Sequence, residues 1–211
     1  MYINTILFDL DGTLIDTAPD LAYALNTLLE DAGLEAKSFE KIKPLVAFGG
    51  KALIKFGFNY DEEHPEFFKR HQELLEIYTN NIDLNSKPFE GVIALIKILK
   101  DRQINWGIVT NKPEYLTHLL LQKLNINVDV VVCGDTLEFS KPHPAPLLYA
   151  CAQFSVDPKR CIFVGDDKND MLAGSNAGIK TVAVTYGYGN VEQNWNYDYK
   201  INHIQELLEI I

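Results

Sequence analysis

The sequence predicts an α/β protein in which helices flank a parallel sheet and an all-helical insertion follows the first strand. Strand-like and helix-like segments alternate regularly over residues 86–211, which is typical of parallel strands joined by right-handed crossovers. The apolar run Ile3 to Phe8 indicates one more buried strand at the start of the chain. No strand signal is evident between these two regions. We therefore expect a discontinuous core, residues 1–15 and 86–211, interrupted by a helical insertion, residues 16–85.

The insertion is predicted to begin with a helix at Thr17, a capping residue that precedes Pro19 and Asp20. Leucine and alanine then recur at helical spacing up to Leu29, and Gly33 is a plausible stop. A Gly49-Gly50 break precedes a second helical stretch. The further helices expected in the insertion cover residues 51–56 and 66–78.

The core is predicted to continue as strands and helices in turn. The expected strands are residues 104–109, 128–132, 161–164 and 181–184. The expected helices are residues 91–100, 113–123, 144–154, 169–177 and 204–210. In an open sheet of this kind, ligands bind at the carboxyl ends of the strands, so the residues at those ends are the candidates for function.

Composition narrows the class of protein. A hydrophobic content of 47% and a charged content of 23% are ordinary for a soluble globular domain of 211 residues. The net charge of -10 argues against nucleic acid or an anionic membrane as a partner. Neither a bilayer-spanning run nor a signal-peptide start is evident, and Cys133, Cys151 and Cys161 lie in apolar contexts as expected for buried thiols. We expect a cytoplasmic protein, either monomer or homodimer.

Polar residues gather at four predicted strand ends. The first strand is followed by Asp9 and Asp11, which flank Leu10, and then by Gly12. The others are followed by Thr110-Asn111-Lys112, by Ser140-Lys141-Pro142 and by Gly165-Asp166-Asp167-Lys168-Asn169-Asp170. An Asp-Gly turn after an edge strand would account for the first pair alone. It would not account for all four ends, and we therefore expect an active site.

Electrostatics limits the chemistry of such a site. Two carboxylates about 4 Å apart repel by roughly 4 kcal/mol, so three in a cluster would cost on the order of 12 kcal/mol. Either some carboxyl groups stay protonated through raised pKa values, or a divalent cation lies among them. Oxygen ligands without His or Cys favour Mg²⁺, which commonly shares its coordination sphere with a substrate phosphate. A carboxylate can attack phosphorus directly, and a second one can move protons.

The same residues resemble, in order, the four motifs of the haloacid dehalogenase superfamily. Asp9-Leu10-Asp11-Gly12-Thr13 is similar to the first motif and Thr110-Asn111 to the second. Lys141 is similar to the third, and Gly165-Asp166 with Asp170 to the fourth. The resemblance implies a Rossmann-like catalytic core and a phosphatase in which residues 16–85 form a cap.

The resemblance also implies a role for each residue. Asp9 would be the nucleophile and Asp11 the general acid/base. Mg²⁺ would be bound by Asp9, the backbone carbonyl of Asp11 and Asp166, with Asp170 as an accessory residue. The phosphate would be held by Gly12, Thr110, Asn111 and Lys141, and Lys141 would also steady the nucleophile. We expect a structural role for Asp167 and a surface helix-cap role for His143.

The substrate is expected to be a small phosphorylated metabolite recognised by the cap. The loop Gly49-Gly50-Lys51 is the candidate for cap specificity, although a helix N-terminus with a solvated lysine would have the same sequence. The full layout is similar to phosphoglycolate phosphatases, and several stretches are closer to N-acetylmuramic acid 6-phosphate phosphatases. A sugar-phosphate mutase of the same layout and a non-catalytic binding or regulatory module are the alternatives.

Overall fold

The computed structural model of the chain describes residues 3–189, 191 and 195–211. It divides into two compact units, one formed by residues 1–16 and 88–211 and the other by residues 17–87. The boundaries expected from the sequence lie one and two residues away from these division points.

Within the described residues, six strands form one sheet in the order β5-β4-β1-β6-β7-β8, and every neighbouring pair is parallel. The strands are β1 (Thr5–Phe8), β4 (Asn105–Val109), β5 (Val130–Val132), β6 (Cys161–Gly165), β7 (Lys180–Val184) and β8 (Tyr199–Ile201). The strand β1 lies between β4 and β6, with Leu7 opposite Gly107 on one side and Phe163 on the other. All four residues of β1 are buried, as expected for a central strand.

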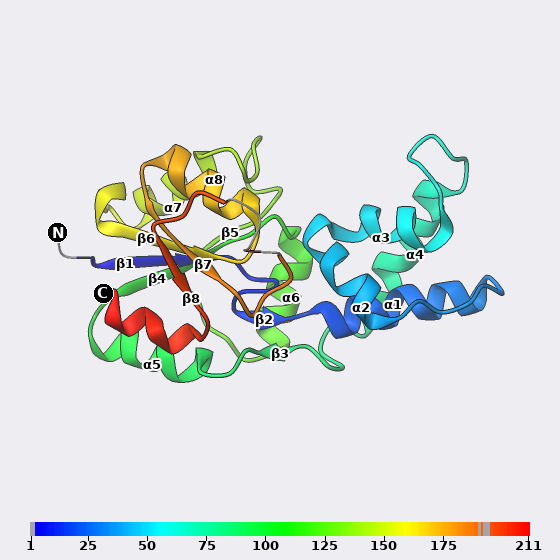
Figure 1. The fold of residues 1–211 in the computed structure, drawn as a ribbon, viewed down its shortest axis with the longest axis horizontal. Helices are drawn as coiled ribbons and strands as arrows, with labels where there is room; N and C mark the ends of the chain where they lie inside the picture. The colour runs from blue at the N-terminus through cyan, green and yellow to red at the C-terminus, as the bar shows by residue number, and fades with distance from the viewer. Residues whose placement is uncertain (1–2, 190, 192–194) are drawn as a thin grey trace. The chain divides into compact units, whose positions relative to one another are not determined.

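Helices cover both faces of this sheet, with α7 and α8 on one face and α5 and the 3₁₀ segment η3 on the other (Figure 1). Their bounds are α5 (Val92–Asp101), α6 (Glu114–Lys123), α7 (Ala145–Gln153), η2 (Pro158–Arg160), α8 (Lys168–Ala177) and η3 (Ile204–Glu209). The apolar side chains of α7 and α8 form one core with Leu7 and Phe163 of the sheet. The predicted α/β fold is therefore confirmed.

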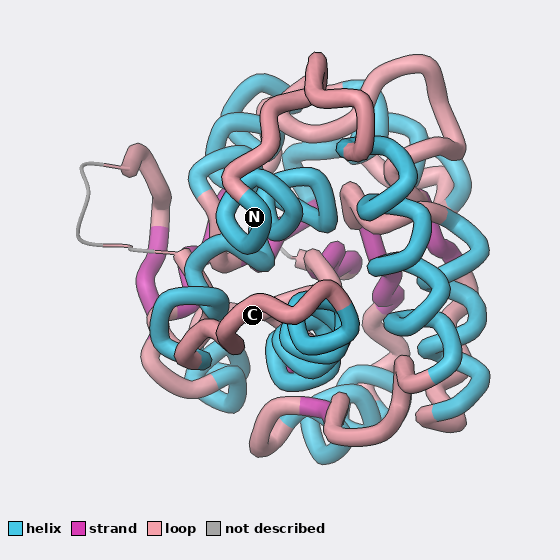
Figure 2. Tube along the Cα trace, turned by 90° about the vertical axis from the view of Figure 1, so that its right-hand side faces the viewer, coloured by secondary structure: helices cyan, strands magenta, loops and turns pink. Residues whose placement is uncertain are grey.

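The regular elements of the inserted unit are helices, apart from Lys87 of β3 at its end, and loops connect them. Figure 2 distinguishes helices, strands and loops along the whole trace. Its elements are α1 (Ala18–Asp31), α2 (Phe39–Ile42), η1 (Lys43–Phe48), α3 (Gly49–Phe58) and α4 (Phe67–Asn80). The side chains of Phe67 and Tyr78 are fully buried in this unit. The carboxylate of Asp20, also buried, accepts hydrogen bonds from the backbone N–H groups of Asn85 and Ser86 at 2.8 Å, which ties the end of the unit to its first helix.

Several local predictions were wrong. The final helix is a 3₁₀ helix, and strand β8 was missed because three residues are too few for an alternation to be recognised. Two short strands, β2 (Ile15–Asp16) and β3 (Lys87–Pro88), were also missed; they form a separate two-stranded sheet. Gly49 and Gly50 belong to α3 and do not precede it as a break. Thr17 occupies the N-cap position of α1, but its side chain makes no capping hydrogen bond.

All three cysteines are buried free thiols, as expected, and the Sγ atoms of Cys151 and Cys161 lie 3.3 Å apart. Across the residues that the structure describes, no helix is long and apolar enough to cross a membrane.

Candidate active site

Parallel strand pairing brings the first and fourth groups of polar residues together. Asp9 follows β1 directly and its backbone N–H donates to the carbonyl of Val164 in β6 at 2.9 Å, so Asp166 follows one strand over. Carboxylate oxygens of Asp9, Asp166 and Asp170 lie within 4.8 Å of one another, and all three residues are buried. Side chains 161 residues apart in sequence thus form one acidic cluster at the carboxyl edge of the sheet.

A buried lysine lies within this cluster. The Nζ atom of Lys141 is 2.7 Å from Oδ1 of Asp9 and 2.7 Å from Oδ1 of Asp170. These two carboxylates raise the pKa of Lys141 against the effect of its burial, and the lysine stays charged. It neutralises only one of the three negative charges that the carboxyl groups would carry.

The pKa values of all three aspartates are raised, because they are buried and one lysine does not neutralise them. Burial raises the pKa of Asp9 to about 7, although Lys141 acts in the opposite direction. Burial, together with the charge of Asp9, raises the pKa of Asp166 well above its usual range, and burial raises that of Asp170. Three buried oxygen donors and one lysine leave a deficit of two positive charges when all the carboxyl groups are ionised. That donor set fits a divalent cation with a preference for oxygen, such as Mg²⁺.

Asp166 is held rigidly in the cluster. Its Oδ1 atom accepts a hydrogen bond from the hydroxyl of Thr13 at 2.9 Å, and its Oδ2 atom accepts one from the backbone N–H of Tyr188 at 2.8 Å. Gly12, with a φ of +84°, and Gly187 approach so closely that a Cβ atom at either position would collide with the Asp166 side chain. The glycines are therefore required by the close approach of backbone to this carboxylate.

Asp170 is positioned by the first turn of α8. Its Oδ2 atom accepts hydrogen bonds from the backbone N–H groups of Asp166 at 3.1 Å and Asp167 at 3.0 Å, which leaves Oδ1 to Lys141. Asp167 is the N-cap of this helix and accepts from the backbone N–H of Asn169 at 2.8 Å. Asp167 thus has the structural role that was expected, and the reciprocal bonds form a capping box.

The strand end after β4 contacts Lys141 and Asp11 through its second and third residues. The side-chain amide of Asn111 donates to the carbonyl of Lys141 and accepts from its N–H, both at 2.9 Å. The side chain of Lys112 is buried and its Nζ atom lies 3.0 Å from Oδ1 of Asp11. Thr110 is buried and its hydroxyl accepts from the backbone N–H of Lys112 at 3.2 Å. Phosphate binding by Thr110, Asn111 and Gly12 stays a prediction.

Sequence reasoning did not assign Lys112 to the site. Its position directly after Thr110-Asn111 was the available signal, since the chain turns there from β4 towards α6. The segment Tyr186-Gly187-Tyr188 was also not assigned to the site, yet it contacts Asp166. No local pattern distinguishes such a contact, because it depends on how the segment after β7 folds back.

The predicted cap loop lies in the inserted unit. Gly49 has a φ of +76°, and Lys51 lies in the first turn of α3. Lys51 and Lys55 contact the two carboxylate oxygens of Glu62, at 2.9 and 3.1 Å, and about half of each lysine side chain is exposed. The role of Gly49, Gly50 and Lys51 in specificity stays a prediction.

His143 lies outside the acidic cluster, on the surface. Its Nδ1 atom accepts from the backbone N–H of Ala145 at 3.2 Å, and its ring stacks on Phe139. The N-cap residue of α7 is Pro144, so His143 lies one residue before the cap and its ring accepts from the first N–H of the helix.

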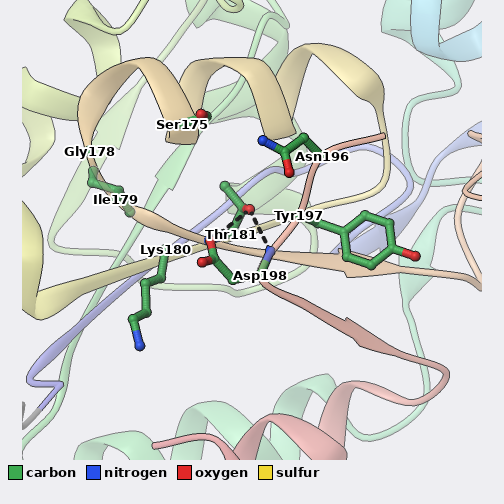
Figure 3. A pocket seen from close by; sticks show the side chains of 8 residues that line it. All are labelled: Ser175, Gly178, Ile179, Lys180, Thr181, Asn196, Tyr197 and Asp198. Atoms are coloured by element: carbon green, nitrogen blue, oxygen red, sulfur yellow. Dashed lines mark hydrogen bonds between the residues drawn. The ribbon is translucent and has the colours of Figure 1, made fainter. Parts of the chain in front are cut away.

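A polar pocket of about 270 Å³ lies at the amino end of β7, away from the cluster of Asp9, Asp166 and Asp170 (Figure 3). It is lined by Ser175, Gly178, Ile179, Lys180, Thr181, Asn196, Tyr197 and Asp198. Within it the carboxylate of Asp198 accepts hydrogen bonds from the N–H and hydroxyl of Thr181 (Figure 3). This pocket contributes nothing to the acidic cluster.

Comparison with known proteins agrees with the geometry. Residues 6–184 match the family model described as haloacid dehalogenase-like hydrolase. The chain belongs to this family. The match extends from β1 to the end of β7, so it includes all four groups of polar residues and the inserted unit.

Relatives within the haloacid dehalogenase-like hydrolases are similar over nearly the whole chain. An N-acetylmuramic acid 6-phosphate phosphatase of Pseudomonas aeruginosa is 36% identical over 100% of this chain and 96% of its own length. A phosphoglycolate phosphatase of Xanthomonas campestris is 38% identical over 88% of this chain and 84% of its own. A crystal structure of a predicted phosphoglycolate phosphatase from Haemophilus somnus superimposes with a TM-score of 0.89 at 29% identity, covering 99% of this chain and 97% of that one. The predicted family and both predicted subgroups are thus confirmed as its relatives.

Proposed function

We propose that this protein is a Mg²⁺-dependent phosphomonoesterase that hydrolyses a small phosphorylated metabolite through an aspartyl-phosphate on Asp9. The observation that carries the proposal is the cluster of Asp9, Asp166 and Asp170 around Lys141 at the carboxyl edge of the sheet. Buried carboxylates in excess of the neighbouring cations are costly to fold, and a bound divalent cation would offset that cost and could in turn bind an anionic phosphate group. The named activities of the two curated relatives support the same reaction class.

The carboxylate of Asp9 is proposed to attack phosphorus and to displace the alcohol oxygen of the substrate. The P–O bond to the alcohol breaks as the bond from Asp9 forms, and the leaving oxygen takes a proton from Asp11. Asp11, now ionised, accepts a proton from water as that water attacks the aspartyl-phosphate. Inorganic phosphate leaves, Asp9 is regenerated and Asp11 is again protonated, so each turnover consumes one water.

Mg²⁺ would be held by the carboxylates of Asp9 and Asp166 and the backbone carbonyl of Asp11, with Asp170 as an accessory group, and would neutralise charge on the transferred phosphoryl group. Lys141 contributes a second positive charge between Asp9 and Asp170 and orients the nucleophile. Lys112, whose Nζ atom lies 3.0 Å from Oδ1 of Asp11, restrains the carboxyl group that is proposed to move protons. Thr110 and the backbone around Gly12 would complete the phosphate site.

Substrate choice is proposed to lie in the inserted unit, acting as a cap. Lys51 and Lys55 share one acidic partner, Glu62, so this face of α3 carries surplus positive charge. Phe68 is exposed, and the Nζ atom of Lys51 lies 5.9 Å from the centre of its ring. A cation beside an apolar ring suits a small substrate that carries a carboxylate. Phosphoglycolate and N-acetylmuramic acid 6-phosphate both carry one.

The test is a phosphate-release screen in which both of these compounds and common sugar phosphates are compared with Mg²⁺ present. We expect one of the two carboxylate-bearing compounds to have the highest kcat/KM, and Asp9→Asn to abolish its hydrolysis. Activation by a sugar bisphosphate with isomerised product would support the mutase alternative. Release from none of the compounds, by protein that binds Mg²⁺, would contradict the phosphatase and favour a binding or regulatory module.

A further inference from the structure

The segment after β7, residues 186–189, crosses the carboxyl edge of the sheet and is called the strap below. It contacts Asp166 closely on one side. The backbone N–H of Tyr188 donates to Oδ2 of Asp166 at 2.8 Å, and the Cβ atoms that Gly187 and Gly189 lack would collide with Asp166. The strap therefore lies directly against Asp166, with no space for a side chain at Gly187 or Gly189.

On its other side the strap holds the chain where it leaves the sheet unit. The hydroxyl of Tyr188 donates to Oδ1 of Asp16 at 2.9 Å, and that of Tyr186 donates to the carbonyl of Thr13, also at 2.9 Å. Asp16 is the last residue of this unit before the insertion begins at Thr17. The strap thus fixes the outgoing connection by two hydrogen bonds.

The returning connection is held by the same segment. Pro88 is the first residue of the sheet unit after the insertion, and the ring of the next residue, Phe89, lies 4.8 Å from that of Tyr186. The backbone N–H of Phe89 donates to the carbonyl of Leu14 at 3.0 Å. Both connections to the insertion are therefore joined to each other and to the strap.

We propose that Tyr186 and Tyr188 are positioning residues that couple the state of Asp166 to both connections of the inserted unit. The coupling rests on the proposed function in so far as Asp166 holds Mg²⁺. When Asp166 is restrained by a cation, the N–H of Tyr188 is restrained with it, and the two tyrosine side chains transmit that restraint to residues 13–16 and 88–89. The coupling is reciprocal: the factor by which Mg²⁺ binding stabilises the two connections is also the factor by which loosening them lowers the affinity for Mg²⁺.

The test is hydrogen exchange of the full chain with and without Mg²⁺, in the absence of any substrate. The reporters are the backbone N–H groups of Ile15 and Phe89, which are hydrogen-bonded to the carbonyls of Leu10 and Leu14. In the unsubstituted protein we expect Mg²⁺ to slow exchange at both reporters several-fold. In Tyr188→Phe, which keeps the backbone contact to Asp166 but loses the bond to Asp16, we expect less than half of that slowing. We also expect Mg²⁺ affinity, measured by calorimetry, to fall about fivefold.

Two matched variants make the result specific. Tyr199→Phe removes a hydroxyl that accepts from Lys180 in the same sheet, and it should leave both reporters and Mg²⁺ affinity unchanged. Asp16→Asn keeps an oxygen acceptor for Tyr188 and should retain most of the slowing, whereas Asp16→Ala should lose it. Equal slowing in Tyr188→Phe and the unsubstituted protein would overturn the coupling. Mg²⁺ binding without any slowing of exchange at the reporters would also overturn the coupling, but it would leave the proposed function intact. Absence of Mg²⁺ binding would overturn the metal assignment and the coupling together.

Discussion

The side-chain amide of Asn111 holds the backbone of Lys141 at two points, by donating to its carbonyl and accepting from its N–H at 2.9 Å each. This pairing joins the strand end after β4 to the lysine that contacts Asp9. An amide engaged in this way orients Lys141 and, through it, Asp9, the proposed nucleophile. Substitution of a side chain that only orients Lys141 should lower kcat, whereas substitution of one that binds phosphate should weaken inhibition by phosphate.

Asn111→Ala should therefore lower kcat by roughly 10- to 100-fold with little change in KM, because Lys141 loses its alignment. Steady-state kinetics and inhibition by inorganic phosphate would be measured together. Asn111→Asp keeps the acceptor but not the donor, so its kcat should lie between that of Asn111→Ala and that of the unsubstituted protein. Thr110→Ala, at a residue expected to bind phosphate, should weaken phosphate inhibition. Equal weakening in Asn111→Ala would assign Asn111 to phosphate binding instead.

Asp9→Asn should reduce turnover by about 1,000-fold or more, because a neutral amide cannot form the aspartyl-phosphate. The fold should persist, since the substitution removes one of three crowded buried carboxyl groups. Activity and the circular dichroism spectrum would be compared with those of Asp198→Asn, at the other end of β7. Substantial activity in Asp9→Asn would place the nucleophile elsewhere.

Asp11→Asn should slow both formation and hydrolysis of the aspartyl-phosphate by roughly 100-fold or more, because one residue is proposed to donate and then accept the proton. Rapid-quench single-turnover experiments separate the two steps. Lys112→Met, which removes the cation 3.0 Å from Asp11, should give a smaller loss in the same steps. Unchanged single-turnover rates in Asp11→Asn would remove it from the acid/base role.

Gly12→Ala should abolish Mg²⁺ binding or weaken it by at least about tenfold, because the new Cβ atom would displace the carboxylate of Asp166. The control is Gly33→Ala. Gly33 also has a positive φ, +72°, but has open space around it, so its substitution should cost about 1 kcal/mol in stability and leave Mg²⁺ binding intact. Calorimetric titration of both variants distinguishes a collision at the site from backbone strain alone.

The metal-free protein should lose stability as pH rises from about 4 to above 7. In the folded state burial raises the pKa of Asp9 to about 7, against a usual value of 3.8, and raises that of Asp166 well above it. The folded state therefore binds more protons than the unfolded state in this window, and each pKa unit corresponds to about 1.4 kcal/mol. Mg²⁺ competes with those protons.

Urea unfolding at pH 5.5 and pH 8, with EDTA or with Mg²⁺, would measure this effect. We expect Mg²⁺ to stabilise the protein more at pH 8 than at pH 5.5. Asp166→Asn should reduce the pH dependence of the metal-free protein. Greater metal-free stability at pH 8 than at pH 5.5 would contradict the raised pKa values.

The sequence by itself determined the fold class, the order of the strands and helices, and the edge of the sheet where polar residues gather. Apolar runs such as Ile6–Phe8 indicate buried strands, and parallel strands present their carboxyl ends at the same edge, so Asp9 and Asp166 were expected at that edge. The pairing of β1 with β6 brings them together. The elements missed, β2, β3 and β8, have only two or three residues, too few for a periodic signal. The last helix was predicted, but its 3₁₀ form was not.

Only the tertiary structure decided how the aspartates are supported. The amide of Asn111 bonds to Lys141 and not to a neighbour in sequence, and the lysine of the second strand end pairs with Asp11. Tyr188, 172 residues from Asp16, contacts both it and Asp166. Such contacts join segments that are distant along the chain. Their partners depend on side-chain reach and backbone direction, which local propensity and spacing do not encode.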